Sequence, residues 1–315
     1  MVHSMVSTRI FFVTDLHGSD ICFRKFLNAG SFYKADVLIM AGDMTGKLVV
    51  PVVEQPNGTF KAWYLGADKI VKANEVEKLE QAIRDVGFYP YMTKEEKVDQ
   101  AQSEKLFMEE VTARVRNWLD LADKVLKGTK TRLFVSPGND DVFDIDPLLE
   151  FSTDKVNPEG PTEQRPVHVD NNHEMISLGW TNPTPWATSR ECSEEELAKK
   201  IDALISKVSN MEQCIFNFHC PPLNSGLDDA PKIDKDLRTR PETVGVGSKA
   251  VLEAVVTHKP LLGLHGHIHE SRGTMKVGPR TLCFNPGSEY SEGILRGAII
   301  NIDEKGVKGF LLTSG

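Results

Sequence analysis

Five apolar runs in this chain each end in a cluster of polar side chains, and this pattern constrains the fold most strongly. The runs read RIFFVT, DVLIMAGD, TRLFVSPGND, CIFNFHCPP and PLLGLHGHIH. Continuous apolar and β-branched runs of this length are typical of strands that are covered on both faces. Helical patterns lie between several of them, and strands that alternate with helices indicate an α/β architecture.

The polar clusters follow the carboxyl ends of the expected strands, where open α/β sheets bind their ligands. They contain two carboxylates, one carboxamide and four imidazoles, namely Asp15, His17, Asp43, Asn139, His219, His267 and His269. Mixed oxygen and nitrogen donors suit divalent metals such as Mn, Fe, Zn, Co or Ni. Seven donors are too many for one tetrahedral ion, whereas two ions that share one carboxylate would use them all.

Each of these histidines, taken alone, is more commonly a core or loop residue than a metal ligand. The prediction therefore depends on the whole set. His265 alternates with His267 and His269, so that all three point the same way if the strand continues. It either supports a ligand, contacts the substrate or is structural, and we include it as a candidate catalytic residue.

In chain order the motifs DLH, GD, GND, H and GHIH resemble the calcineurin-like metallophosphoesterase superfamily. The resemblance extends from Arg9 to about Ser288, and the segment NPGS also resembles a loop of that family. It implies a four-layer α/β/β/α sandwich with a dinuclear metal centre. By resemblance, Asp15, His17 and His269 bind the first metal, Asn139, His219 and His267 bind the second, and Asp43 bridges the two.

The resemblance implies a metal-dependent phosphoesterase in which a metal-bridging hydroxide attacks phosphorus. Two ions about 3.5–4 Å apart stabilise both the attacking and the leaving oxygen of such a displacement. The expected substrate is a small phosphorylated or nucleotide-type molecule. The alternative is a catalytically weak or inactive protein of the same fold that serves as a binding scaffold.

Asp140 departs from the pattern, because many members of the superfamily carry a histidine after the GN pair. That histidine helps to bind the substrate or to protonate the leaving group. An aspartate is anionic at neutral pH and provides no cationic clamp, unless burial or a like-charged neighbour such as Asp141 raises its pKa. We therefore expect Asp140 to be a candidate catalytic residue and favour phosphodiesters, which carry one charge fewer than monoesters.

We expect a single domain over 1–315, with an insertion over about 47–102. The segment GKLVVPVVEQPNGTFKAWYLG predicts a β-hairpin, and helical patterns follow, the second from about Lys94 into Lys127. The insertion is either a cap beside the site or a peripheral decoration. The tail segments GTMKVG, RTLCFNPGS, RGAIINID and GVKGFLLTSG predict an antiparallel meander that completes a second sheet.

Composition limits the cellular setting and the partners. The formal net charge of -8 argues against binding to nucleic acid, which usually requires a basic face. Five cysteines without a CxxC pair indicate free thiols in a reducing compartment. There is no signal-peptide pattern and no apolar run of membrane-spanning length. We expect a cytoplasmic protein without a membrane partner, and this composition is compatible with a homo-oligomer.

Overall fold

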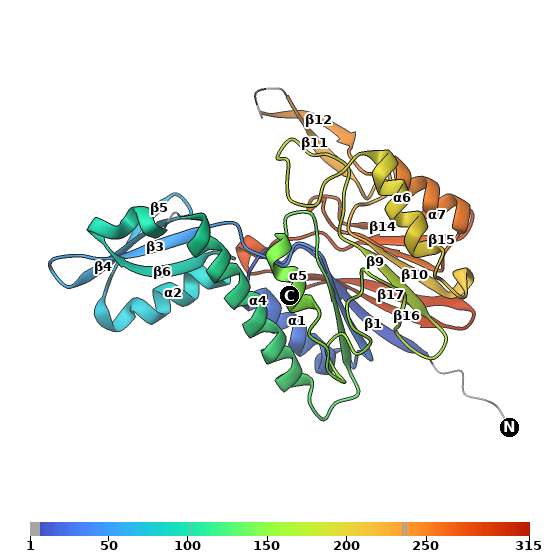
Figure 1. The fold of residues 1–315 in the computed structure, drawn as a ribbon, viewed down its shortest axis with the longest axis horizontal. Coiled ribbons are helices and arrows are strands. Elements are labelled where there is room, and N and C mark those ends of the chain that lie inside the picture. Colours follow the sequence, from blue (N-terminus) through green and yellow to red (C-terminus); the bar gives the residue numbers. More distant parts are fainter. Residues whose placement is uncertain (1–6, 102, 235, 237) are drawn as a thin grey trace.

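The computed structural model describes residues 7–101, 103–234, 236 and 238–315 of the chain, and two sheets form its body (Figure 1). The first sheet has the strand order β17-β16-β1-β2-β7. Its parallel strands are β1 (Thr8–Val13), β2 (Val37–Ala41) and β7 (Arg132–Ser136), and its antiparallel strands are β16 (Arg296–Asp303) and β17 (Gly306–Ser314).

The second sheet has the order β14-β15-β13-β10-β9-β8. Its four central strands run parallel and are β9 (Glu174–Leu178), β10 (Cys214–Phe218), β13 (Leu262–Leu264) and β15 (Thr281–Asn285). The antiparallel strands β8 (Val167–His168) and β14 (Gly273–Val277) form its edges. A hairpin of β11 (Asp229–Ile233) and β12 (Thr239–Gly245) projects from this side of the body (Figure 1).

Both faces of each sheet are covered by apolar side chains, which explains the continuous apolar runs. Between the sheets, Phe12 and Ile39 share a buried cluster with Ile215 and Leu264. The alternate side chains of the first sheet pack on α1 (Asp20–Phe32) and α4 (Glu104–Leu126), and those of the second pack on α6 (Glu194–Ile205) and α7 (Lys249–His258). The predicted mixed α/β architecture is confirmed.

The remaining helical elements are short. They are η1 (Ala73–Glu75), η2 (Glu95–Lys97), η3 (Phe143–Ile145), α5 (Asp146–Leu149), η4 (Met211–Gln213) and η5 (Tyr290–Glu292). No helix in the described ranges is long and apolar enough to cross a membrane. All five cysteines are free thiols.

The prediction that the tail forms one meander is wrong. Strands β14 and β15 belong to the second sheet, whereas β16 and β17 belong to the first. The alternation of apolar residues identifies these segments as strands, but it does not identify their neighbours. Strand β16 joins the first sheet because Ala298, Ile300 and Ile302 pack in the cluster between the sheets, and β16 pairs with β1.

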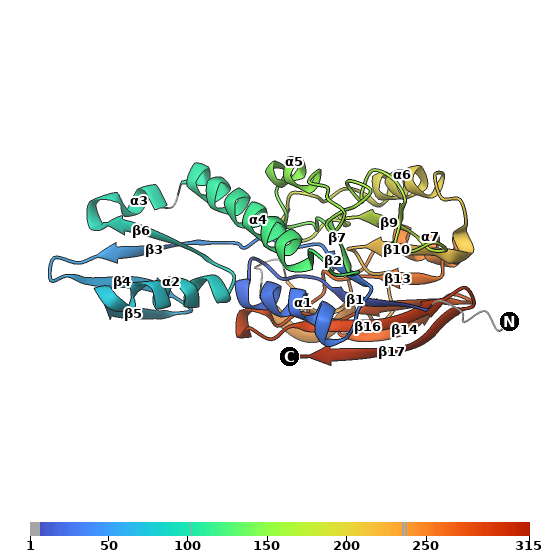
Figure 2. The same cartoon turned by 90° about the horizontal axis from the view of Figure 1, so that it is seen from below.

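Residues 49–101 form a subdomain that projects from the body (Figures 1 and 2), and we call it the insertion. It contains β3 (Val49–Glu54), β4 (Thr59–Tyr64), β5 (Ala67–Lys72) and β6 (Tyr89–Lys94) in the order β5-β4-β3-β6, with α2 (Val76–Asp85) and α3 (Val98–Ala101). Val52, Ala62, Leu79 and Ile83 belong to its own small apolar cluster.

The helix expected to run from about Lys94 into Lys127 begins later than predicted. The segment before it forms β6, which pairs in parallel with β3, and the long helix α4 starts only at Glu104. Ser103 caps it, because its side chain accepts a hydrogen bond from the amide of Leu106. A tertiary strand pairing thus overrides the local helical pattern.

Candidate metal centre

The loops that follow β1 and β2 lie against each other and carry three of the predicted ligands. The amide of Asp15 donates to the carbonyl of Gly42 at 3.1 Å, and the amide of His17 donates to the carbonyl of Asp43 at 2.8 Å. Asp15, His17 and Asp43 all have positive φ angles, of 55°, 41° and 48°. Non-glycine residues rarely adopt this conformation, and such strain gathers at functional sites.

Six of the predicted ligands form two groups, in each of which the donor atoms lie within 4.8 Å of one another. One group is Asp15, His17 and His269, and the other is Asp43, His219 and His267. A carboxylate oxygen of Asp43 lies 3.3 Å from Nε2 of His219 and 3.7 Å from Nε2 of His17. Asp43 therefore reaches both groups, which is the position that a bridging ligand requires.

Three buried atoms at this place have no hydrogen-bond partner among the described residues: Nδ1 of His17, Oδ1 of Asn139 and Nε2 of His219. The amide nitrogen of Asn139 donates to Oγ1 of Thr188 at 2.8 Å, which fixes the orientation of its free oxygen. Nδ1 of His219 lies 3.1 Å from the carbonyl of Ala41. Because buried polar atoms are nearly always paired, this donor set fits bound divalent cations.

The charges of the buried groups are complementary. Burial opposes ionisation of Asp15, but the imidazoles of His219 and His269 outweigh it and lower the pKa of Asp15 to about 2. Burial also disfavours charged His219, but Asp43 and Asp15 outweigh it and raise the pKa of His219 to about 10. Burial lowers the pKa of His267 to about 4, so that its imidazole is neutral, as a metal ligand must be.

Asp140 lies at the same place, with one carboxylate oxygen 3.8 Å from Nδ1 of His17. Its amide donates to a carboxylate oxygen of Asp43 at 2.9 Å. Burial and the neighbouring Asp43 carboxylate raise the pKa of Asp140. Nζ of Lys47 lies 2.6 Å from the carboxylate of Asp140 and provides a cation that the sequence analysis did not identify. Lys47 follows Asp43 by four positions, and this proximity was the available signal.

Asp141 has a different role from that of Asp140. It is fully buried, and its carboxylate accepts hydrogen bonds from the amides of Met44, Thr45 and Gly138 at 2.8–3.1 Å. Burial and the nearby Asp43 raise its pKa to about 6. These bonds tie the loop after β2 to the loop after β7. Asp141 therefore positions the loops that carry Asp43 and Asn139.

His265 is a predicted site residue that the structure does not bring into the two groups of donors. Its Nδ1 lies 2.8 Å from the carbonyl of Phe218 and 3.1 Å from that of Cys220, and the side chain is fully buried. The alternation argument fails because β13 ends at Leu264 and His267 has a φ angle of 69°. These contacts are those of a residue that supports the backbone around His219.

The segment NPGS packs against the ligand loops. The Ser288 hydroxyl donates to the carbonyl of Asp15 at 2.6 Å, and the Asn285 side-chain amide donates to the carbonyl of Ile268 at 2.9 Å. Just beyond it, the ring of Tyr290 lies 4.7 Å from the imidazole of His17, measured between centroids. Tyr290 was also missed, although it follows the NPGS segment by two positions, and this proximity was the available signal.

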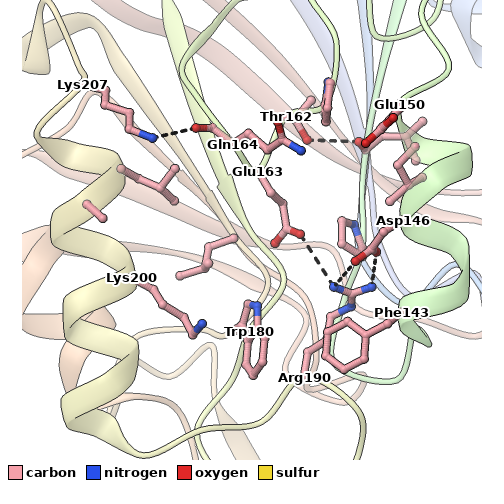
Figure 3. A pocket seen from close by; sticks show the side chains of 17 residues that line it. Phe143, Asp146, Glu150, Thr162, Glu163, Gln164, Trp180, Arg190, Lys200 and Lys207 are labelled. Carbon is pink, nitrogen blue, oxygen red and sulfur yellow. Dashed lines mark hydrogen bonds and ion pairs between the residues drawn. The ribbon is translucent and has the colours of Figure 1, made fainter.

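A cavity of about 550 Å³ lies beside the end of β7, and its lining includes none of the predicted ligands (Figure 3). Arg190 is buried in its wall, where the guanidinium pairs with Asp146 and stacks on the ring of Phe143. The Arg190 amide donates to the carbonyl of Asn139 at 3.1 Å, and its Nε donates to that of Asp141 at 3.0 Å. Arg190 thus holds the loop after β7 from the side opposite the metal ligands.

Comparison with known proteins supports the fold but names no activity for this chain. No protein-family model matches the sequence. The uncharacterized protein MJ1162 of Methanocaldococcus jannaschii is 32% identical over 152 residues, which are 48% of this chain and 61% of that protein. The match therefore leaves more than a third of the relative uncovered.

Solved structures match over nearly the whole chain. One has a TM-score of 0.56 at 14% identity and covers 98% of this chain and 99% of its own. TT1561 of Thermus thermophilus has a TM-score of 0.53 at 13% identity, with the same coverage. A dimetal phosphatase from Danio rerio has a TM-score of 0.44 at 11% identity, over 97% of this chain and 98% of its own. The first two matches show that the chain shares its fold with known structures.

Proposed function

We propose that this protein is a metal-dependent phosphoesterase with a dinuclear centre. The observation that carries the proposal is the position of Asp43, whose carboxylate lies within reach of imidazoles from both groups of donors. The order of the ligands along the chain resembles that of calcineurin-like metallophosphoesterases. The four-layer α/β/β/α sandwich is part of the same proposal, and the two helix-covered sheets support it.

Each predicted ligand has an assigned place in this proposal. Asp15, His17 and His269 would hold one ion, Asn139, His219 and His267 would hold the other, and Asp43 would be shared between them. When bound, a pair of divalent ions supplies Lewis acidity and lowers the pKa of water. The chain contributes a rigid, buried donor set, because hydrogen bonds to backbone carbonyls and to Thr188 hold His219 and Asn139 in place. The substrate class is a small phosphorylated or nucleotide-type molecule.

The prediction that diesters are preferred over monoesters rested on the lack of a cation beside Asp140. That premise does not hold, because Nζ of Lys47 lies 2.6 Å from the Asp140 carboxylate. The proposed function therefore covers hydrolysis of phosphate esters without a preference for diesters.

The test is metal removal followed by reconstitution. The protein is stripped with a chelator, and Mn²⁺, Fe²⁺, Zn²⁺, Co²⁺, Ni²⁺ or Mg²⁺ is added back one at a time. Hydrolysis of nitrophenyl phosphate and of bis-nitrophenyl phosphate is then measured. We expect turnover that requires at least one of these metals. A folded protein that binds two ions but hydrolyses neither ester would instead indicate a binding scaffold.

A further inference from the structure

We propose that Lys47 and the hydroxyl of Tyr290 form a binding site for the terminal phosphate of a phosphomonoester at the rim of the metal centre. This inference rests on the proposed function and names the substrate class of the same site. It also assigns a task to the residues where the insertion meets the body, namely Gly46, Lys47, Gly87 and Tyr89, which we call the base of the insertion. The backbone, the charge and the neighbours of Lys47 each support the assignment.

The backbone at Lys47 is held by its preceding residue. The amide of Gly46 donates to the hydroxyl of Tyr89 at 2.7 Å, and Tyr89 is fully buried beneath the guanidinium of Arg114. A Cβ atom on Gly46 would lie 1.9 Å from the carbonyl oxygen of Gly87, so only glycine fits here. The segment that enters the insertion at Gly46 and the turn between α2 and β6 at Gly87 therefore touch through their backbones.

The same segments pack directly on the loop that carries His17. A Cβ atom on Gly87 would lie 2.2 Å from the carbonyl oxygen of His17, and Gly87 has a φ angle of 91°. The guanidinium of Arg114 also donates a hydrogen bond to the carbonyl of Gly18. The base of the insertion and the ligand loop thus form one packed unit. The position of Lys47 relative to the metal ligands is set by backbone contacts rather than by a flexible linker.

The Lys47 side chain is placed by one strong partner and is otherwise available. Its ammonium lies 2.6 Å from the carboxylate of Asp140, and the Lys47 side chain is 52% exposed while that of Asp140 is 18% exposed. Within the described ranges, Lys47 makes no second hydrogen bond or ion pair. Because a lysine ammonium has three donors, two remain for an incoming ligand. Asp140 therefore acts as a positioning residue that holds the cation beside the site.

Tyr290 is the second residue of the proposed phosphate site. Its ring lies 4.7 Å from the His17 imidazole and 6.1 Å from the His269 imidazole, measured between centroids. The Tyr290 hydroxyl has no hydrogen-bond partner among the residues that the structure describes, although the ring is partly buried. A neutral phenol hydroxyl donates to a phosphate oxygen without adding charge. Lys47 and Tyr290 therefore offer donors on the side of the centre that His17 and His269 form.

These donors match a terminal phosphate better than a diester. A monoester phosphate carries one more negative charge at neutral pH and one more non-bridging oxygen than a diester. Because the attraction between two charges grows with their product, the extra charge strengthens the interaction with an ammonium. Removal of Lys47 should therefore weaken the binding of monoesters more than that of diesters.

The experiment compares variants of the full chain reconstituted with the metal that gives the highest wild-type turnover. Lys47→Met removes the cation, Lys47→Arg preserves it, and Tyr290→Phe removes the hydroxyl. Lys61→Met is the matched control, because Lys61 is an ion-paired lysine of the insertion, 3.0 Å from Asp68. Initial rates are measured with nitrophenyl phosphate and bis-nitrophenyl phosphate, and the binding of inorganic phosphate to the metal-loaded protein is measured by calorimetry.

We expect Lys47→Met to lower kcat/KM for the monoester by about 10- to 100-fold, mainly through KM, the range expected for a hydrogen bond to a charged group. For the diester we expect a decrease of less than about threefold, and Lys47→Arg should retain most monoester activity. Tyr290→Phe should lower monoester kcat/KM by about fivefold. Phosphate affinity should fall in parallel in Lys47→Met.

The inference is overturned if Lys47→Met behaves like Lys61→Met with both esters and in phosphate binding. That result leaves the proposed function intact, because wild-type turnover still depends on metal. Conversely, if no metal supports turnover, the proposed function fails, and calorimetry on the protein loaded with the metal that binds most tightly still decides the inference. A loss of phosphate binding in Lys47→Met supports it, and unchanged phosphate binding overturns it.

Discussion

At the carboxyl edge of the body, where the parallel strands end and the ligand loops begin, polar side chains are buried. In the insertion, by comparison, many large apolar side chains are exposed. Asp15, His17 and Asp43 are almost inaccessible to solvent, and their backbones adopt left-handed conformations. In the insertion, by contrast, the large apolar side chains of Trp63 and Ile70 are more than 60% exposed. The carboxyl edge thus combines buried polar groups with strained backbone, whereas the insertion has only a small apolar core.

The two regions meet beside the ligand loops, where the Ser19 hydroxyl also donates to the carbonyl of Asp85. The base of the insertion contributes Lys47, and the surrounding backbone packs on the His17 loop without intervening side chains. The contrast indicates that substitutions at the edge and at this base should affect metal or phosphate binding. Substitutions on the distal strands of the insertion should affect neither. Variants of both regions test this difference, and the variant with the largest expected effect lies at the carboxyl edge.

The largest effect is expected for Asp43→Ala, because it removes the carboxylate that reaches both groups of donors. Two bound ions per chain should fall to one or none, and metal-dependent turnover should fall to background. Metal content after desalting and titration calorimetry measure this. Asp68→Ala, on an exposed strand of the insertion, is the control and should bind two ions. Two ions retained in Asp43→Ala would refute the bridging assignment.

Asp141→Ala should destabilise the body strongly. The substitution leaves the buried amides of Met44, Thr45 and Gly138 without their acceptor, and each unsatisfied buried group costs about 1–3 kcal/mol. We expect a loss of about 3 kcal/mol or more in the free energy of unfolding, measured by urea denaturation. Asp154→Ala, whose side chain is 85% exposed, should change it by less than about 0.5 kcal/mol. If Asp141→Ala is as stable as the wild type, the hydrogen bonds of Asp141 do not stabilise the loops after β2 and β7.

The pH dependence of stability should reveal the titration of Glu163, which lines the cavity beside the end of β7. Burial raises the pKa of Glu163 from 4.5 to about 7, against opposing effects of the Gly179 amide and Arg190. Between these values the folded protein retains a proton that the unfolded chain releases. The resulting stabilisation is complete below pH 4.5 and is lost as the pH rises through about 7.

Glu163→Gln should remove this component, because the amide does not titrate while its oxygen still accepts from Gly179. The difference in unfolding free energy between wild type and variant, measured from pH 4 to pH 8, should therefore change by no more than about 3 kcal/mol. A difference that is constant over this range would show that Glu163 titrates normally in the folded protein.

Tyr89→Phe tests the base of the insertion with a smaller change. It removes the hydroxyl that accepts from the Gly46 amide, and we expect a loss of about 1–2 kcal/mol in stability with weaker phosphate binding. Trp63→Ala is the matched control on the exposed face of the insertion, and it should leave stability nearly unchanged and phosphate binding unaffected. If the two variants have the same stability and the same phosphate affinity, the base of the insertion does not position the phosphate-binding residues.

Many strands of the fold are predictable from the apolar pattern of their own segments. RIFFVT and DVLIMAGD indicate buried strands because apolar side chains occupy both faces, and the structure pairs them in parallel as β1 and β2. Strand β9 was missed, since EMISL contains two polar residues that tertiary contacts satisfy. The partners of β15 and β16 were also not predictable, because a period of two defines a strand face but not its neighbour.

The sequence by itself determined which donors stand at the strand ends, because aspartate, asparagine or histidine follows each of the five apolar runs where its strand terminates. Only the tertiary structure decided the surroundings of those donors. Lys47 and Tyr290 lie near the GD and NPGS motifs in sequence, but only the folded chain shows that their side chains reach the site, and Arg190 comes from a distant loop. The alternation that groups His265 with His267 and His269 does not continue past Leu264, where β13 ends. A side chain's direction depends on where the strand ends, and long-range packing sets that point.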